Sequence, residues 1–342
     1  MKILACPDKL RGTCTALEAA AAMARGGRRS GAVTTVVPLA DGGEGTLESL
    51  AAVGGLMRRT TVSGPLGDPV VAEWLLWGGR AFIEMARASG LELVGGAERN
   101  DALGASTYGT GELIAAAVGA GARTVTVALG GSATTDGGFG ALRALEPVAR
   151  LKGVRLVVAC DVTTTFVDAA VVFGPQKGAT AAQVNLLTRR LQRLADLYQR
   201  EYDVDVTAIA GAGAAGGLAG ALVAIGAELR SGFAMVADVV NLADRIQEAD
   251  VIITGEGFLD HESFHGKVVG GVCEMAAAAS KPVLVVVGDV LDGLAEPGAL
   301  PLPQGANVEV VSLVDRFGED RSRQETATCI EEVVAQWCAT RE

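Results

Sequence analysis

The sequence has few aromatic residues, and this absence limits what can fill its core. Aromatic residues make up 4% of the 342 residues, whereas hydrophobic residues make up 49% and glycine occurs 46 times. Alanine, valine and leucine must therefore supply the packing, as they do in parallel sheets that are covered by helices. The composition favours an α/β protein, and the length allows two domains of about 100–200 residues each.

Paired cysteines and long apolar runs are also absent. The six cysteines include no Cys-x-x-Cys pair, so neither a structural zinc site nor a disulfide framework is indicated. No stretch reaches the roughly 18 consecutive apolar residues of a membrane span, and the apolar run after Lys2 meets Asp8 too early for a signal peptide. We therefore expect buried free thiols in a soluble, cytoplasmic protein.

The sequence also lacks an excess of basic residues. With 29 basic and 40 acidic residues, the formal net charge at pH 7 is −11. This charge argues against nucleic acid or an anionic membrane as the main partner. An anionic substrate would need a local cluster of cations.

Strand-like and helix-like segments alternate at both ends of the chain. Strands at 3–6 and 33–37 are each followed by a helix, and this rhythm returns after about residue 236. Between them, residues 58–85 have the β-rich texture of antiparallel strands joined by Gly-Pro and Gly-Gly turns. Capping boxes that predict helix starts begin at Thr15, Thr180 and Ser322. We predict one domain from residues 1–57 and 236–342 and a second from residues 58–235.

The stretch Leu129–Gly138 reads LGGSATTDGG and directly follows strand-like residues 124–128. Its small residues leave backbone N–H groups open, which suits a phosphate or carboxylate at the start of a helix. Asp136, at the far end, could accept a proton from a neighbouring group. A tight strand-to-helix turn explains the same residues equally well.

The two histidines of the chain, His261 and His265, match the zinc-protease pattern His-Glu-x-x-His. That pattern binds zinc only when both histidines share one face of a continuous helix. Gly255 and Gly257 precede the pattern and Gly266 ends it, so we favour a solvated loop.

Residues 211–216 match the dinucleotide fingerprint Gly-x-Gly-x-x-Gly. The fingerprint needs an acid at the end of the next strand, yet Glu228 lies in a segment that resembles a turn. We favour the interpretation that these glycines allow close helix packing. A loop that contacts phosphate and a nicotinamide-binding site are the alternative interpretations.

Six loops rich in glycine and charged residues lie beside predicted strand ends. Phosphoryl transfer from a magnesium nucleotide needs their components: carboxylates for hard cations, lysines against developing negative charge, and amide-lined loops for phosphates. The signature Gly-x-x-x-x-Gly-Lys-Ser/Thr is absent, which excludes a P-loop kinase. The six loops contain Pro7–Arg11, Asp41–Glu44, Asp136, Asp161, Phe173–Gly178 and Thr254–Asp260 with Lys267.

These loops carry a family resemblance. The sequence resembles the bacterial class I glycerate kinases over nearly its whole length, with its matching stretches in the same order. Segments 145–154 and 162–172 are shorter than in that family. The matching stretches are Ala40–Thr46, Thr107–Ile114, Leu129–Gly138, Ala159–Val162, Val172–Ala179, Gly211–Gly217, Ile253–Gly257, Leu259–Asp260 and Gly266–Lys267.

The resemblance implies transfer of the ATP γ-phosphate to D-glycerate, with 2-phosphoglycerate favoured over 3-phosphoglycerate. It also implies a Rossmann-like parallel-sheet domain, an inserted second α/β domain with mixed or antiparallel strands, and an active site in the cleft between them. The alternatives are an NAD-dependent oxidoreductase of a small hydroxy acid and a non-catalytic protein that binds a small anion. The sequence does not decide whether the protein forms a homodimer.

The kinase hypothesis assigns a role to each candidate residue. For substrate binding they are Asp8, Arg11, Gly130, Gly131, Ser132 and Ala133. The base is Asp136 or Asp161, and Lys177 and Lys267 neutralise the transferring group. Magnesium is assigned to Asp41, Glu256 and Asp260, and the nucleotide to Gly42, Gly43, Gly211, Gly213, Gly216 and Gly255.

Overall fold

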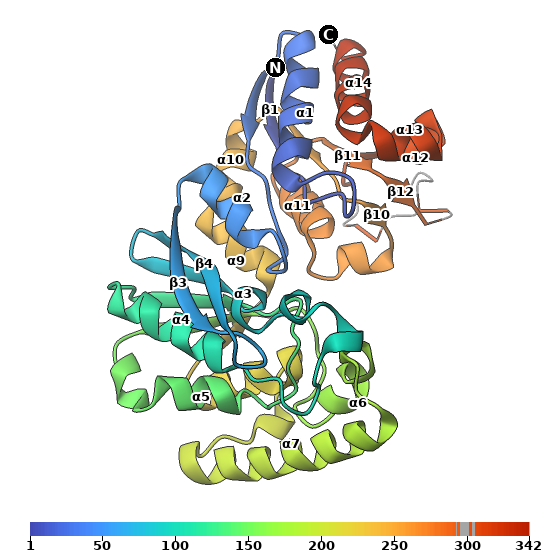
Figure 1. Cartoon of the computed structure of the whole chain (residues 1–342). Helices are drawn as coiled ribbons and strands as arrows, with labels where there is room; N and C mark the ends of the chain where they lie inside the picture. The colour runs from blue at the N-terminus through green and yellow to red at the C-terminus, as the bar shows by residue number, and fades with distance from the viewer. Residues whose placement is uncertain (292, 295–300, 303–304, 342) are drawn as a thin grey trace. The chain divides into compact units, whose positions relative to one another are not determined.

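The computed structural model describes residues 1–291, 293–294, 301–302 and 305–341. The chain divides into two units, each with its own sheet (Figure 1). Unit 1 contains residues 1–41, 48–53 and 232–342, and unit 2 contains residues 42–47 and 54–231.

Unit 1 is built on a five-stranded sheet in which every neighbouring pair of strands is parallel, in the order β13-β11-β9-β1-β2. This confirms the predicted Rossmann-like parallel sheet. The inner strands β9 and β11 are buried, nearly continuous apolar runs, as expected where helices cover both faces. Their bounds are β1 Lys2–Ala5, β2 Val33–Val36, β9 Val251–Thr254, β11 Val283–Val287 and β13 Val308–Ser312, with a small pair β10 Phe258–Leu259 and β12 Asp289–Val290.

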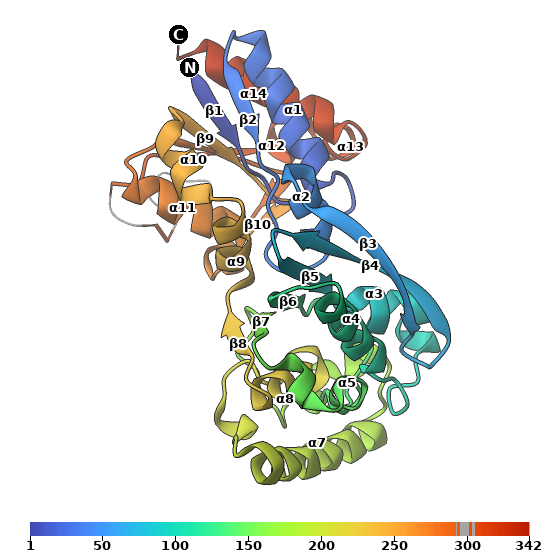
Figure 2. The same ribbon diagram turned by 90° about the vertical axis from the view of Figure 1, so that its left-hand side faces the viewer.

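Helices cover the sheet of unit 1 on two faces (Figure 2). Helices α1 and α14 lie side by side on one face, where Met23 of α1 and Val333 of α14 share a buried cluster with Ile3 and Val286 of the sheet. The helices of this unit are α1 Ala16–Arg29, α9 Gly232–Val239, α10 Leu242–Glu248, α11 Val268–Ala278, α12 Leu313–Phe317, α13 Glu319–Gln324 and α14 Thr326–Ala339, and α2 Thr46–Val53 starts in unit 2.

Unit 2 is built on a six-stranded mixed sheet in the order β3-β4-β5-β6-β7-β8. Strands β3 to β5 pair antiparallel and β5 to β8 pair parallel, which confirms the predicted second α/β unit with antiparallel strands. The strands are β3 Leu56–Ser63, β4 Pro69–Trp77, β5 Arg80–Glu84, β6 Thr124–Ala128, β7 Arg155–Ala159 and β8 Glu228–Arg230. The helices are α3 Ala86–Ser89, α4 Tyr108–Gly119, α5 Phe139–Leu145, α6 Ala169–Phe173, α7 Ala181–Tyr202 and α8 Leu218–Ala224.

Two of the three predicted capping boxes are confirmed. Thr15 and Thr180 each accept the N–H of the residue three positions later, whose side chain accepts the cap N–H in return. The third box is wrong, because Ser322 lies inside α13 and its hydroxyl donates to the carbonyl of Glu319 at 2.9 Å.

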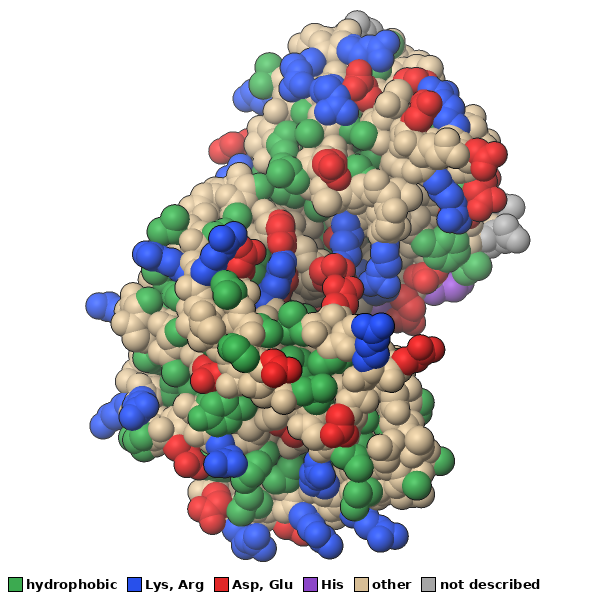
Figure 3. Space-filling model, viewed as in Figure 1, with side chains coloured by type: hydrophobic (Ala, Val, Ile, Leu, Met, Phe, Trp, Pro, Cys, Tyr) green, Lys and Arg blue, Asp and Glu red, His purple; other side chains and the backbone are tan. Residues whose placement is uncertain are grey.

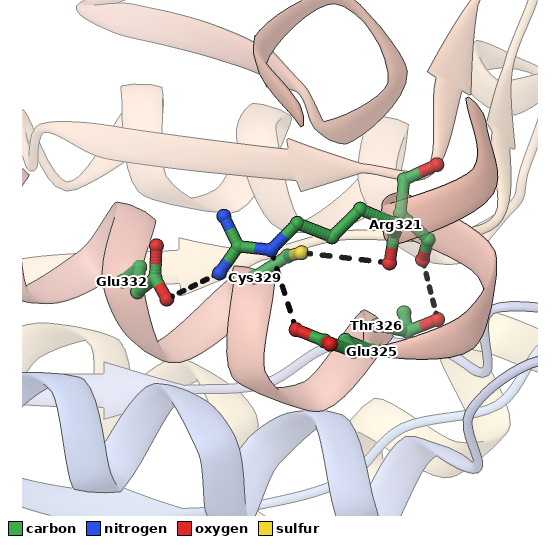
Figure 4. Close-up of polar contacts among 6 residues, drawn as sticks. Arg321, Glu325, Thr326, Cys329 and Glu332 are labelled. Carbon is green, nitrogen blue, oxygen red and sulfur yellow. Dashed lines mark hydrogen bonds and ion pairs between the residues drawn. The ribbon is translucent and has the colours of Figure 1, made fainter. Parts of the chain in front are cut away.

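Arg321 links α13 to the last helix of the chain. Its Nε donates to Glu325 at 3.2 Å and its Nη2 donates to Glu332 at 2.6 Å (Figure 4). These contacts tie α13 to α14 although the predicted capping box does not form.

The surface carries charges of both signs. Figure 3 shows acidic and basic side chains interspersed over one face of the molecule, so the net charge of −11 does not form a single acidic patch there. Among the described residues, no helix has the length and apolar character that crossing a membrane requires.

Candidate active site

One edge of the unit 2 sheet collects the polar residues that follow its parallel strands. Strand β5 ends at Glu84, β6 is followed by Gly130, β7 by Asp161, and β8 ends at Arg230. Because β5 to β8 run parallel, these carboxyl ends lie at the same edge. Ligands of open α/β sheets bind at this edge, so it is a candidate site.

The loop after β6 presents backbone donors at this edge. Gly130 and Gly131 are exposed and Ser132 is half-buried. Within the described part of the chain, the N–H groups of these three residues have no hydrogen-bond acceptor. The Cα of Gly43 lies 3.3 Å from where a Cβ on Gly130 would be, so the 42–47 segment approaches the same loop.

A short antiparallel bridge fixes the orientation of the peptide groups in this loop. The N–H of Leu91 donates to the carbonyl of Gly131 at 2.9 Å, and the N–H of Ala133 donates to the carbonyl of Ser89 at 2.9 Å. In a trans peptide the N–H points opposite to the carbonyl. The N–H of Ser132 therefore points away from segment 89–91, as an anion-binding donor would have to.

Asp136 is almost fully engaged within the protein. It is 9% exposed, and its Oδ2 accepts the N–H of Thr107 at 2.8 Å, the hydroxyl of Thr107 at 2.9 Å and the N–H of Gly140 at 3.2 Å. Its Oδ1 accepts the N–H of Gly138 at 3.1 Å. The carboxylate thus ties the starts of α4 and α5 together, while its role as the base stays a prediction.

Lys177 lies beneath the same loop. It is 3% exposed, and its Nζ donates to Ser132 Oγ at 2.8 Å and to the carbonyl of Thr134 at 2.7 Å. Burial lowers the pKa of Lys177 to about 7, against the opposing effect of the negative charge on Asp136. Both of these Nζ contacts are with the protein, and contact with a transferring phosphoryl group stays a prediction.

The glycines of residues 211–217 pack against protein backbone, as we favoured. Gly216 has φ +67°, and a Cβ there would lie 2.0 Å from the carbonyl oxygen of Thr134. A Cβ on Gly213 would lie 2.2 Å from the carbonyl oxygen of Thr165. A nucleotide contact at Gly211, Gly213 or Gly216 stays a prediction.

The residues around this glycine segment lack the other parts of a dinucleotide site. Residues 206–208 form a 3₁₀ turn where the fingerprint requires a strand. Glu228 lies at the start of β8, where it accepts from Arg155 at 2.6 Å. The acid at the end of the next strand, which would bind a ribose, is therefore not Glu228.

Unit 1 gathers a second group of predicted residues after β1 and β9. The N–H of Asp8 donates to the carbonyl of Gly255 at 2.9 Å, which joins the two strand ends. Burial, then the charge of Asp41, raises the pKa of Asp8 to about 7. Burial also raises the pKa of Glu256 to about 7, with smaller contributions in the same direction from the charges of Asp8 and Asp260.

These carboxylates fit a divalent cation. Glu256 Oε1 is buried and has no hydrogen-bond partner among the described residues. Magnesium is usually held by one or two carboxylates together with substrate phosphates. A protein cage is not present: the described residues contain no group of three or more His, Cys, Asp or Glu side chains that could hold a metal alone.

The zinc-protease pattern does not form a continuous helix. Residues His261–Phe264 form a single 3₁₀ turn, and the side chain of His265 is 70% exposed. The favoured interpretation, a solvated loop, is therefore confirmed.

The predicted site residues fall into two sets, one in each unit. Unit 1 contains Asp8, Arg11, Asp41, Gly255, Glu256, Asp260 and Lys267. Unit 2 contains Gly42, Gly43, Gly130, Gly131, Ser132, Ala133, Asp136, Asp161, Lys177, Gly211, Gly213 and Gly216.

The comparison with known families agrees with the chemistry of these residues. The sequence profile of the glycerate kinase family matches residues 3–148 and 146–340. The chain belongs to the glycerate kinase family.

Curated and solved glycerate kinases resemble the chain over most of its length. Glycerate 2-kinase of Escherichia coli K12 is 41% identical over 331 residues, covering 85% of this chain and 86% of the relative. Glycerate kinase of Bacillus subtilis 168 is 39% identical over 352 residues, covering 88% and 92%. A crystal structure of a glycerate kinase 2 from Salmonella typhimurium LT2 superposes with a TM-score of 0.86 at 38% identity, covering 100% of this chain and 98% of that one. Glycerate kinase activity is thereby supported.

Sequence reasoning missed an ion pair at this edge of the unit 2 sheet. The side chain of Glu84 is 5% exposed, and it accepts the N–H of Leu47 at 3.1 Å and Arg87 Nε at 3.0 Å. An acid at a predicted strand end was the available signal, the same one that identified Asp161. Asn100, which binds the carbonyls of Ala133 and Lys177, gave no comparable signal.

Proposed function

We propose that the protein transfers the γ-phosphoryl group of ATP to a hydroxyl of D-glycerate, with 2-phosphoglycerate favoured over 3-phosphoglycerate. The observation that supports this most is the set of N–H groups at Gly130, Gly131 and Ser132 that have no acceptor among the described residues, in a member of the glycerate kinase family. Backbone donors at a strand end suit the carboxylate of a small hydroxy acid.

In this proposal a guanidinium completes the carboxylate site. Arg11 is the cation that the sequence suggested, and Arg87 is a second candidate. Glu84 holds Arg87 through Nε, and α3, which contains Arg87, leads into the segment that bridges to residues 131–133. A guanidinium held in one orientation binds a carboxylate more specifically than a mobile ammonium.

Asp161 is the preferred base. It lies two residues after the end of β7 and is exposed, whereas Asp136 is buried. The base must reach the substrate hydroxyl to accept its proton. Asp136 is the second choice.

Unit 1 would supply the residues that hold magnesium. One or two of the carboxylates of Asp41, Glu256 and Asp260 are the proposed ligands, together with the phosphates, and Lys267 would lie against the phosphates. Magnesium bound with ATP supplies positive charge that offsets the charge on the phosphates. We further propose that residues 1–57 with 236–342 and residues 58–235 are the two domains.

A coupled assay of ADP release tests the proposed function. D-glycerate is expected to support ADP release, whereas L-lactate, serine and a blank without acceptor are not. Phosphorus NMR of the product then separates 2-phosphoglycerate from 3-phosphoglycerate. ADP release that does not depend on the acceptor would refute the kinase proposal.

Arg87→Gln is expected to raise the KM for D-glycerate about 100-fold, since one charge-assisted contact with a carboxylate is worth roughly 2–3 kcal/mol. The KM for ATP should change less than about twofold, because the loss is confined to carboxylate binding. Steady-state kinetics with each substrate varied in turn gives both constants.

Arg155→Gln is the matched control. Arg155 also pairs with a glutamate, Glu228, but both residues start their strands and so lie at the opposite edge of the same sheet. Its KM for D-glycerate should equal that of the wild type. Equal KM values in the two variants would exclude Arg87 from carboxylate binding.

A further inference from the structure

We propose that Lys177 is a positioning residue that acts through Ser132: it turns the Ser132 hydroxyl outward as a donor to the anionic substrate. This inference rests on the proposed function, because it concerns the same loop. It differs from the direct neutralisation of a phosphoryl group that the sequence suggested for Lys177.

The first support is the direction of the hydrogen bond. Lys177 Nζ donates to Ser132 Oγ at 2.8 Å. An ammonium has three hydrogens and no lone pair, so it can only donate. An anion bound beside Ser132 favours this charged form of Lys177. Ser132 Oγ must then direct its own hydrogen to another acceptor, and no protein acceptor for it is found among the described residues.

The second support is where Lys177 lies. At 3% exposure, its Nζ is covered by the loop that it binds. Its second bond, to the carbonyl of Thr134 at 2.7 Å, points that carbonyl inward. Lys177 therefore holds the Ser132 side chain and the following backbone from beneath, on the side away from solvent.

The third support is that the position of Lys177 is itself fixed. Asn100 Nδ2 donates to the carbonyl of Lys177 at 2.8 Å and to the carbonyl of Ala133 at 2.9 Å, so one amide joins lysine and loop. Gly178 follows with φ +87°, and a Cβ there would lie 2.2 Å from the carbonyl oxygen of Ala97. This close approach packs the turn Pro175–Lys177 against residues 97–100.

A double-mutant cycle separates action through Ser132 from direct action on the phosphoryl group. Lys177→Met and Ser132→Ala are measured singly and together by kcat/KM for D-glycerate, and KM for ATP is measured in each. We expect Lys177→Met and Ser132→Ala each to lower kcat/KM about 10-fold. Both substitutions affect the same hydrogen-bond donor, the Ser132 hydroxyl. The decrease in kcat/KM caused by Lys177→Met should therefore be at least threefold smaller when Ser132 is already alanine.

Additive effects in the cycle would overturn the inference, because they would mean that Lys177 acts independently of Ser132. An increased KM for ATP in Lys177→Met would also overturn it. If wild-type protein shows no D-glycerate-dependent ADP release, the proposed function fails instead. These two failures are therefore distinguishable.

Two controls test whether a loss of activity reflects misfolding of the variant. Lys281→Met removes a lysine whose Nζ also donates to two carbonyls, those of Gln247 and Ala249, in unit 1, and should leave kcat/KM unchanged. If Lys177→Met does not fold, Lys177→Gln takes its place in the cycle, since glutamine keeps a donor at this position.

Discussion

Asp136→Ala is expected to lower the free energy of unfolding by about 3–5 kcal/mol, because it removes one partner from a buried charged network. The backbone N–H groups of Thr107, Gly138 and Gly140 would lose their acceptor at once. Urea unfolding followed by circular dichroism measures this change. Asp136→Asn keeps the shape and one acceptor oxygen, so it should fall between alanine and the wild type.

Asp161→Ala is the comparison that separates a structural carboxylate from a base. Asp161 is exposed, so its removal should change the free energy of unfolding by less than about 0.5 kcal/mol. If Asp161 is the base, turnover should fall at least about 100-fold. Asp136→Ala with wild-type stability and no turnover would reverse the two assignments.

Gly216→Val is expected to prevent the accumulation of folded protein. Gly216 has φ +67°, where a β-branched residue is strained, and the added Cβ would lie 2.0 Å from the carbonyl oxygen of Thr134. Neither the glycine segment nor the loop before Asp136 could keep its path. Soluble yield and the Tm from scanning fluorimetry are the measurements.

Gly119→Ala is its matched control. Gly119 lies at the end of α4, and a Cβ there would have no heavy atom within 4 Å. Alanine favours the helix, so the Tm should stay the same or rise. A Gly216→Val protein that melts like Gly119→Ala would show that the glycine segment does not pack as described.

Local signals predicted the fold well. The capping boxes at Thr15 and Thr180 are confirmed because cap and partner lie three residues apart, within one helical turn. The apolar run 251–254 is the strand β9. The box at Ser322 is wrong because the helix that starts at Glu319 already includes the serine, which no three-residue pattern reveals.

The site was harder to predict, because its contacts join residues that are distant in sequence. Lys177 binds Ser132 across 45 positions, and Glu84 binds the N–H of Leu47 across 37. A loop motif identifies residue types, but it does not show which carboxylates are buried and hydrogen-bonded within the protein. Asp136 and Asp161 therefore looked equivalent in the sequence, although the structure buries one and exposes the other.

The strand order of unit 1 has a consequence for synthesis of the chain. Strand β1, residues 2–5, lies between β2 and β9, and β9 begins only at Val251. The whole sheet of unit 2, from β3 to β8, ends at Arg230 and leaves the ribosome before β9 does. Domains generally fold as units during synthesis. Unit 2 can therefore complete its sheet first. During that time one side of β1 has no strand to pair with, because β9 is synthesised about 250 residues later.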